Sequence, residues 1–156
     1  MYRGDIENIG ITWEALLLTM ITQKYLDGLT YKIIGCAIEV HKEMGPGLLE
    51  SVYHKCLLYE LDTKGLKYKS ELEVPVKYKG EILNAGLRLD VLVEDQIIVE
   101  LKAVEEFHPI YFATLLSYMK LLRKPKGILI NFNCTNIFKE GQKTMVNEIY
   151  ASLIDK

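Results

Sequence analysis

The chain of 156 residues is long enough for one domain with its own core, and its 49% apolar and 26% charged residues are ordinary globular values. A net charge of −2 lacks the basic excess typical of nucleic-acid-binding proteins, so such a role would need a local basic surface. Three cysteines without CxxC spacing indicate reduced thiols in a cytoplasmic protein rather than a disulfide framework or a zinc site. No run is long and apolar enough to span a membrane.

The N-terminal part of the chain shows helical spacing of its apolar residues. The pattern predicts a helix over residues 13–25, within an extension over 1–28 that is either helical or flexible. The main domain is expected to cover residues 29–156.

Two helices are predicted to open this domain. Thr30 can cap a helix that runs to about Met44, where a Gly-Pro-Gly sequence at 45–47 ends it. A second helix is predicted over residues 48–64.

Strand signals follow. Alternation over residues 72–78 predicts a half-exposed strand, in which Pro75 suggests an edge or a bulge. The Lys79-Gly80 turn would let residues 81–85 pair back, and residues 86–103 read as an apolar hairpin with its turn at 94–96.

The last third of the chain predicts a helix, a strand and a helix. Pro109 suits the first turn of a helix that ends near Leu122, residues 127–132 form a buried strand, and residues 139–153 a closing helix. The order αα-βββ-α-β-α predicts an α/β fold with a mixed central sheet flanked by helices.

Charged residues lie within the apolar hairpin of residues 86–103. Because side chains alternate along a strand, Glu100 and Lys102 share one face, and Asp90 on the partner strand can converge with them. Two carboxylates beside an ammonium group favour a divalent cation, Mg²⁺ or Mn²⁺, held by the carboxylates. The alternative is a partly buried ion-pair cluster, which gains little over apolar packing.

The spacing Asp90, nine residues, then Glu100-Leu101-Lys102 resembles the motif of the PD-(D/E)xK nuclease superfamily. Residues 33–53 look very like the signature of its GxxExxY branch, of which Gly47, Glu50 and Tyr53 are the namesake residues. The resemblance continues through residues 128–133 and implies a restriction-endonuclease-like core.

This resemblance implies a Mg²⁺- or Mn²⁺-dependent nuclease that hydrolyses phosphodiester bonds in nucleic acid, with DNA the favoured substrate. Asp90, Glu100, the Leu101 carbonyl and Glu50 would hold the metal or its water, and Lys102 would orient the attacking water. Glu50 has a second interpretation, as a carboxylate that interacts favourably with the helix dipole.

Further candidates are less sharply indicated. Arg88, Tyr111, Thr114 and Tyr118 are possible contacts with the site or substrate. Lys120, Arg123, Lys124 and Lys126 form a basic cluster that either holds phosphates or is a solvated face.

One departure from the family pattern favours a second function. Members usually carry His-x-Ala-Gln on the helix after the ExK strand, where this chain has Tyr111 and Thr114 in place of the histidine and the glutamine. Because threonine reaches less far, the alternative is a catalytically weak or inactive module that retains the nuclease fold and binds nucleic acid or protein. For either function the sequence leaves the oligomeric state open between a monomer and a homodimer.

Overall fold

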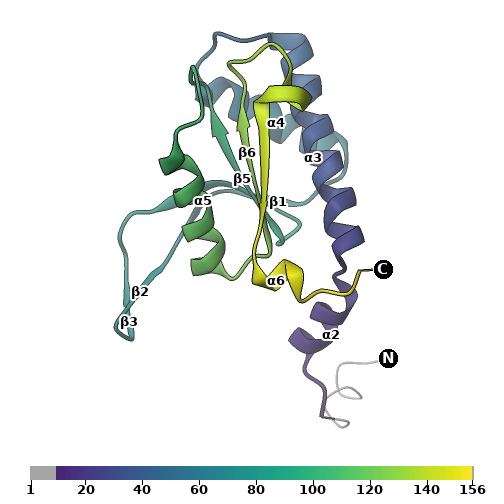
Figure 1. Ribbon diagram of the computed structural model, residues 1–156, viewed down its shortest axis with the longest axis vertical. Coiled ribbons are helices and arrows are strands. Elements are labelled where there is room, and N and C mark those ends of the chain that lie inside the picture. The colour runs from purple at the N-terminus through teal and green to yellow at the C-terminus, as the bar shows by residue number, and fades with distance from the viewer. Residues whose placement is uncertain (1–9, 156) are drawn as a thin grey trace.

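A five-stranded mixed sheet forms the centre of the computed structural model, which describes residues 10–155 (Figure 1). The elements in chain order are α2 (Trp13–Met20), α3 (Gln23–Met44), α4 (Glu50–Thr63), β1 (Tyr68–Glu73), β2 (Val76–Tyr78), β3 (Glu81–Leu83), β4 (Arg88–Val93), β5 (Ile97–Lys102), α5 (Pro109–Leu122), β6 (Lys126–Asn131), η1 (Ile137–Gly141), β7 (Gln142–Val146) and α6 (Glu148–Ala151). The sheet has the order β1-β4-β5-β6-β7, with β5 and β6 parallel and the other neighbours antiparallel. This arrangement confirms the predicted α/β class with a mixed central sheet.

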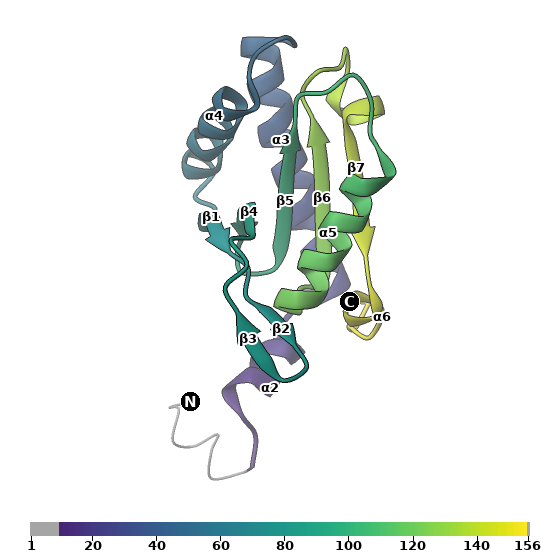
Figure 2. The same cartoon turned by 90° about the vertical axis from the view of Figure 1, so that its left-hand side faces the viewer.

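Helices cover both faces of the sheet (Figures 1 and 2). Helices α3 and α4 pack on the face that carries Ile97, Val99 and Leu101, whereas α5 packs on the face of Ile98 and Leu129. The alternation predicted for β5 is therefore confirmed, since its apolar side chains divide between two cores. Within residues 10–155, no helix has the length and hydropathy needed to cross a membrane.

A glycine sets how closely α5 approaches the sheet. A Cβ atom on Gly127 would lie 2.7 Å from Leu115 Cδ1 and 2.9 Å from Met119 Sδ, both on α5. Such distances are too short for non-bonded atoms, so a larger residue at 127 would require Leu115, Met119 or α5 itself to shift. The position of α5 matters because its opposite end lies beside the charged residues of β5.

The N-terminal helices differ from the prediction. The expected helix over residues 13–25 is interrupted after Met20, and α3 begins at Gln23 with Thr22 as its cap, accepting a hydrogen bond from the Tyr25 amide. Thr30 is not a cap but a buried residue inside α3, where its hydroxyl donates to the Leu26 carbonyl. The helix therefore runs across residue 28, and residues 1–9 of the expected extension lie outside the described part.

The strand expected over residues 72–78 is divided at Pro75. β1 ends at Glu73, and β2 leaves the central sheet to pair with β3 in a separate two-stranded hairpin. The Lys79-Gly80 turn is confirmed, with φ angles of 50° and 86° that suit a two-residue hairpin turn. Proline has no amide hydrogen to donate, so the chain leaves the sheet there.

The closing helix predicted over residues 139–153 is wrong. The chain forms the π-helical turn η1, then β7, which pairs antiparallel with β6, and only then the short helix α6. Asn147 starts α6 by accepting hydrogen bonds from the amides of Ile149 and Tyr150. Pairing with the buried strand β6 overrides the local helical pattern, as tertiary contacts often do.

An ion pair between a buried lysine and a partly exposed aspartate joins three elements at the start of β6. Lys126 Nζ lies 2.7 Å from Asp27 Oδ1 of α3 and 5.2 Å from the ring centroid of Tyr150 of α6. The Tyr150 hydroxyl donates to the same Asp27 oxygen over 2.8 Å. The Lys126 side chain is only 6% exposed, so its charge depends on these partners.

We expect Asp27→Asn to lower the free energy of unfolding by about 2 kcal/mol or more, because it leaves a buried ammonium group without its counter-charge. The matched control is Glu39→Gln, which breaks the exposed Glu39–Lys42 pair and should cost less than ~0.5 kcal/mol. Urea unfolding of both variants measures the difference, and equal losses would contradict a structural role for the Asp27–Lys126 pair.

Candidate active site

The carboxyl groups of Asp90 on β4 and Glu100 on β5 each accept a hydrogen bond from a backbone amide of the other strand. The Asp90 amide donates to Glu100 Oε1 over 3.0 Å, and the Leu101 amide donates to Asp90 Oδ2 over 2.7 Å. The regular pairing of β4 with β5 covers Val91–Val93 and ends there. Beyond that point, side-chain carboxylates replace carbonyl groups as acceptors, and the two acidic groups are brought together.

Burial and mutual repulsion dominate the electrostatics of this pair. Glu100 is 7% exposed, and desolvation is the main cause that raises its pKa to about 8, followed by the negative charge of Asp90. The hydrogen bond from the Asp90 amide and the positive charge of Lys102 lower the pKa but do not offset the burial. At neutral pH without a cation, the Glu100 carboxyl group is therefore mainly protonated.

Lys102 lies beside the acidic pair and against α5. Its ammonium nitrogen is 4.6 Å from the ring centroid of Tyr111, within the range of a cation–π contact. His108, the residue before α5, packs edge-on against the same ring at 5.5 Å between centroids. Tyr111 thus occupies a place where it can orient the Lys102 side chain.

The start of α4 is fixed by Tyr53. Its buried hydroxyl donates to the Gly45 carbonyl over 2.5 Å and accepts from the Leu48 amide over 3.1 Å, and its ring stacks on Phe132 at 4.5 Å. Gly47 has φ 99°, a conformation that disfavours other residues. Gly47 and Tyr53 therefore shape the loop that leads into Glu50, the first residue of α4.

Glu50 comes to the acidic pair from the helical layer on the other side of the sheet. Its side chain is exposed to solvent, yet desolvation of its carboxyl group is the largest cause that raises its pKa, and the charge of Asp90 adds to it. Lys102 and His54 act in the opposite direction. The charges of Asp90 and Lys102 on β4 and β5 act on the Glu50 carboxyl group. The position of Glu50 is therefore compatible with a role in the site as well as with the helix-dipole interpretation.

Helix α5 brings two more of the candidate residues to the same region. The pKa of Tyr118 is raised by desolvation and then by the charges of Glu100 and Asp90, so its hydroxyl group lies near both. Thr114 lies one turn before Tyr118 and is half-buried. Arg88 is exposed at the start of β4, two residues from Asp90.

The basic cluster lies elsewhere. Lys126 pairs with Ile97 at the start of β5 and Lys102 pairs with Asn131 at its end, so the two lysines are separated by about 16 Å along the sheet. Lys124 forms an ion pair with Asp95 at 3.1 Å, and Lys126 with Asp27. Lys120 and Arg123 are exposed. Phosphate contacts by this cluster stay a prediction, and they would be remote from Glu100.

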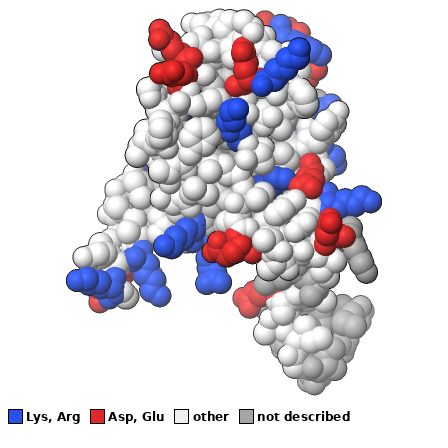
Figure 3. Space-filling view, viewed as in Figure 1, with Lys and Arg blue, Asp and Glu red and all other residues white. Residues whose placement is uncertain are grey.

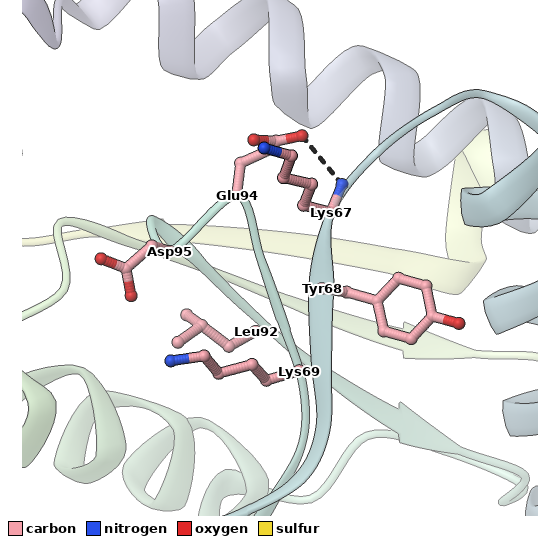
Figure 4. A pocket seen from close by; sticks show the side chains of 6 residues that line it. All are labelled: Lys67, Tyr68, Lys69, Leu92, Glu94 and Asp95. Atoms are coloured by element: carbon pink, nitrogen blue, oxygen red, sulfur yellow. Dashed lines mark hydrogen bonds between the residues drawn. The ribbon is translucent and has the colours of Figure 1, made fainter.

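A separate pocket of about 260 Å³ lies at the far end of β4 from Asp90 (Figure 4). Its lining consists of Lys67, Tyr68, Lys69, Leu92, Glu94 and Asp95. The Glu94 side chain there accepts a hydrogen bond from the Lys67 amide over 2.9 Å. The pocket contains neither Asp90 nor Glu100, and Asp95 is already paired with Lys124.

The residues present fit a hard divalent cation in part. Among residues 10–155, no group of three or more His, Cys, Asp or Glu side chains is arranged to hold a metal ion. Magnesium commonly takes one or two carboxylates from the protein and keeps several waters. The adjacent carboxyl groups of Asp90 and Glu100 provide that number, and the buried Glu100 would lose its repulsion with Asp90 once a cation neutralised the pair.

The comparison with known families agrees with this geometry. The profile of the PD-(D/E)XK nuclease superfamily matches residues 27–145, which include every residue of the acidic pair, Lys102 and Glu50. The chain belongs to the PD-(D/E)XK nuclease superfamily. No curated protein and no solved structure matches the chain. Superfamily membership supports a nuclease-type function and the restriction-endonuclease-like fold expected from the sequence.

The sequence analysis did not identify two side chains near the acidic pair as candidate site residues. His54 lies one turn after Glu50 on α4, and its Nε2 is 3.0 Å from the Ser70 hydroxyl of β1. Its i+4 spacing from Glu50 was a usable signal. Asn131, at the end of β6, accepts from the Val104 amide and donates to its carbonyl, so it holds the segment after Lys102. Only the tertiary fold reveals that contact.

The raised pKa of Glu100 predicts how stability depends on pH. Unfolded glutamate ionises near pH 4.5, whereas folded Glu100 keeps its proton up to about pH 8, so the free energy of unfolding should fall as pH rises between these values. Above about pH 8 the ionised Glu100 lowers the free energy of unfolding by roughly 5 kcal/mol, at about 1.4 kcal/mol per pKa unit. Glu100→Gln should remove most of this decline, and millimolar Mg²⁺ should raise the melting temperature of the wild type at pH 8.5.

Thermal unfolding between pH 4.5 and 9 without metal tests this expectation, with Glu43→Gln on the exposed end of α3 as the matched control. If Glu100→Gln and the control lose stability with pH to the same extent, Glu100 is not the group responsible.

The contact between Lys102 and Tyr111 can be tested without any activity. Tyr111→Phe keeps an aromatic face, whereas Tyr111→Leu removes it, and a cation–π contact contributes roughly 0.5–2 kcal/mol. We expect NMR signals of the Lys102 side-chain methylenes to keep their ring-current shift in Tyr111→Phe and lose it in Tyr111→Leu. Identical spectra for the two variants would show that the ring does not contact Lys102.

Proposed function

We propose that the protein is a Mg²⁺- or Mn²⁺-dependent nuclease that hydrolyses phosphodiester bonds in DNA. The observation that supports it is the reciprocal backbone bonding of Asp90 and Glu100, with Lys102 beside them. This arrangement places two carboxyl groups side by side, one of them buried, and superfamily membership connects such a pair with nuclease chemistry. The proposal places the protein in the GxxExxY branch and in the cytoplasm, where its three free cysteines stay reduced.

Each residue has a role in the proposed reaction. Asp90 and Glu100, with the Leu101 carbonyl, would hold the cation, which would lower the pKa of a water and stabilise charge on the phosphate. Lys102 orients the attacking water and stabilises the phosphate oxygens, and Glu50 holds a further water through its exposed carboxylate. The water oxygen forms a bond to phosphorus as the bond to the leaving sugar oxygen breaks, and the released protons pass to that oxygen and to solvent.

Residues of α5 would complete the site. Tyr111 would orient Lys102 through the cation–π contact, and Tyr118, near both acidic groups, and Thr114, one turn before it, would contact the substrate. Arg88, exposed next to Asp90, would contact a phosphate beside the cleaved bond.

A second candidate function rests on the same helix. Tyr111 and Thr114 stand where family members carry histidine and glutamine, so the chain lacks one amide that could orient water or phosphate. The alternative is a module that binds nucleic acid or protein with weak turnover or none.

Charge-neutral variants distinguish these functions. Asp90→Asn and Glu100→Gln should lower cleavage of single- and double-stranded DNA by at least about 100-fold and abolish Mg²⁺ and Mn²⁺ binding. Lys102→Met should lower cleavage similarly but keep metal binding, since lysine is not a ligand. Glu43→Gln and Lys32→Met, two exposed residues of α3, serve as controls.

Cleavage assays with Mg²⁺, Mn²⁺ or EDTA and calorimetric metal titrations provide the two measurements. DNA binding without turnover by the wild type would select the second function. A wild type that shows neither a heat of metal binding nor cleavage of DNA or RNA would refute the metal-dependent nuclease.

A further inference from the structure

The β2–β3 hairpin, residues 76–83, projects from the sheet beyond β1 and β4 (Figures 1 and 2). It pairs only with itself, through Val76–Leu83, Lys77–Ile82 and Tyr78–Glu81. A two-stranded hairpin alone is marginally stable in water, so a projecting one would gain stability by packing against a partner.

A short segment connects the hairpin to β4, the strand that carries Asp90. β4 begins at Arg88, immediately after the hairpin's return segment, and reaches Asp90 two residues later. The Val74 amide donates to the Leu87 carbonyl over 2.8 Å, and both side chains pack in the core under α5. The base of the hairpin is thus fixed to the same part of the sheet as Asp90.

One strand and the turn of the hairpin carry basic and aromatic side chains, and the other strand carries Glu81 and the exposed apolar Ile82 and Leu83. Lys77, Tyr78 and Lys79 are all exposed, and Lys79 Nζ lies 5.5 Å from the Tyr78 ring centroid. None of the ion pairs in the described residues involves Lys77 or Lys79. Figure 3 shows Lys and Arg side chains gathered over the hairpin and along the adjoining lower edge of the molecule. This is a local basic surface in a chain whose net charge is −2.

We propose that the β2–β3 hairpin grips duplex DNA beside the cleavage site, with Lys77 and Lys79 on phosphates. The inference rests on the proposed nuclease function, since it assigns the hairpin to the substrate of that site. A two-stranded ribbon fits the major groove of B-DNA, whereas the major groove of duplex RNA is too deep and narrow for it. The geometry therefore favours duplex DNA over duplex RNA and over a single strand.

The reach of the hairpin limits where it touches the DNA. Ten residues separate Gly80 at its tip from Asp90, so the tip lies at most roughly 33 Å away at ~3.3 Å per residue. At ~3.4 Å per base pair this is about ten base pairs from the cut. Contacts should accordingly fall within one helical turn on one side of the cleaved bond.

The test compares two double variants with equal loss of charge. Lys77→Gln with Lys79→Asn removes the hairpin lysines, and asparagine before Gly80 suits the positive φ of residue 79, so the turn is preserved. The control, Lys24→Gln with Lys32→Gln, removes two exposed lysines of α3 on the opposite face of the sheet. Circular dichroism and melting temperatures check that both variants fold.

Binding to a fluorescent 30-bp DNA duplex is measured by anisotropy in EDTA at several salt concentrations, so that no turnover is needed. The hairpin variant should bind several-fold more weakly, and its salt slope should fall by about 1.8, or 0.9 per lysine, relative to wild type and control. Footprinting should show protection lost within about ten base pairs on one side of the site.

Three results would overturn the proposal. In the first, the hairpin and control variants differ from wild type by the same amount. In the second, the hairpin variant loses equal affinity for a 30-nucleotide single strand. The third result concerns Ile82, which is exposed and lies opposite Lys77 in the hairpin. A wild-type dimer in sedimentation that Ile82→Asp converts to monomer, with DNA binding unchanged, would make the hairpin a contact between copies.

These results separate the hairpin from the nuclease. Metal-dependent cleavage with normal binding by the hairpin variant would refute the grip and leave the nuclease intact. Lysine-dependent DNA binding without any cleavage would refute the nuclease and leave the grip intact. A wild type that neither binds nor cleaves DNA would refute both.

Discussion

The exchange of hydrogen bonds between Asp90 and Glu100 is the constraint on which the site depends. Two neighbouring strands would normally pair amide to carbonyl, but here two amides donate to carboxylates instead. A carboxylate that accepts backbone hydrogen bonds has a fixed position, and both acidic groups are then held close together. The cost is the repulsion and desolvation that raise the pKa of Glu100 to about 8.

Contacts in the surrounding elements fix the position of the residues around this pair. Tyr53 fixes the loop from which Glu50 emerges, Asn131 fixes the segment after Lys102, and Tyr111 contacts the lysine itself. The Tyr53 hydrogen bonds join α4 to the loop before it, the Asn131 bonds join β6 to the segment after β5, and the Tyr111 contact joins α5 to β5. A shift of any one of them would move a charged group relative to the acidic pair, so the fold and the proposed chemistry depend on the same contacts.

The sequence predicts what alternation and local turn chemistry determine. The β4–β5 hairpin, the Lys79-Gly80 turn and the start of α5 at Pro109 follow from such local signals, and the structure confirms them. The convergence of Asp90 with Glu100 also follows from the two-residue period of a strand. By contrast, β7 forms because β6 offers an edge to pair with, and no local pattern in residues 142–146 reveals that edge. The partners of Lys124 and Lys126, Asp95 and Asp27, are likewise distant in sequence. Their ion pairs therefore could not be predicted from the clustering of charges along the chain.

The two ends of the parallel strand pair β5–β6 differ in whether a buried charged group has a partner of opposite charge. At one end, Lys126 has Asp27 and Tyr150 as partners, so its charge is compensated within the protein and serves stability. At the other end, Glu100 meets a second carboxyl group, and the one nearby ammonium group does not compensate the burial. A domain selected for stability alone would gain from an apolar pair in place of Asp90 and Glu100. The uncompensated end is therefore the one where an external cation would be stabilising, and that asymmetry within a single strand pair is the physical reason to look for chemistry at Glu100 and not at Lys126.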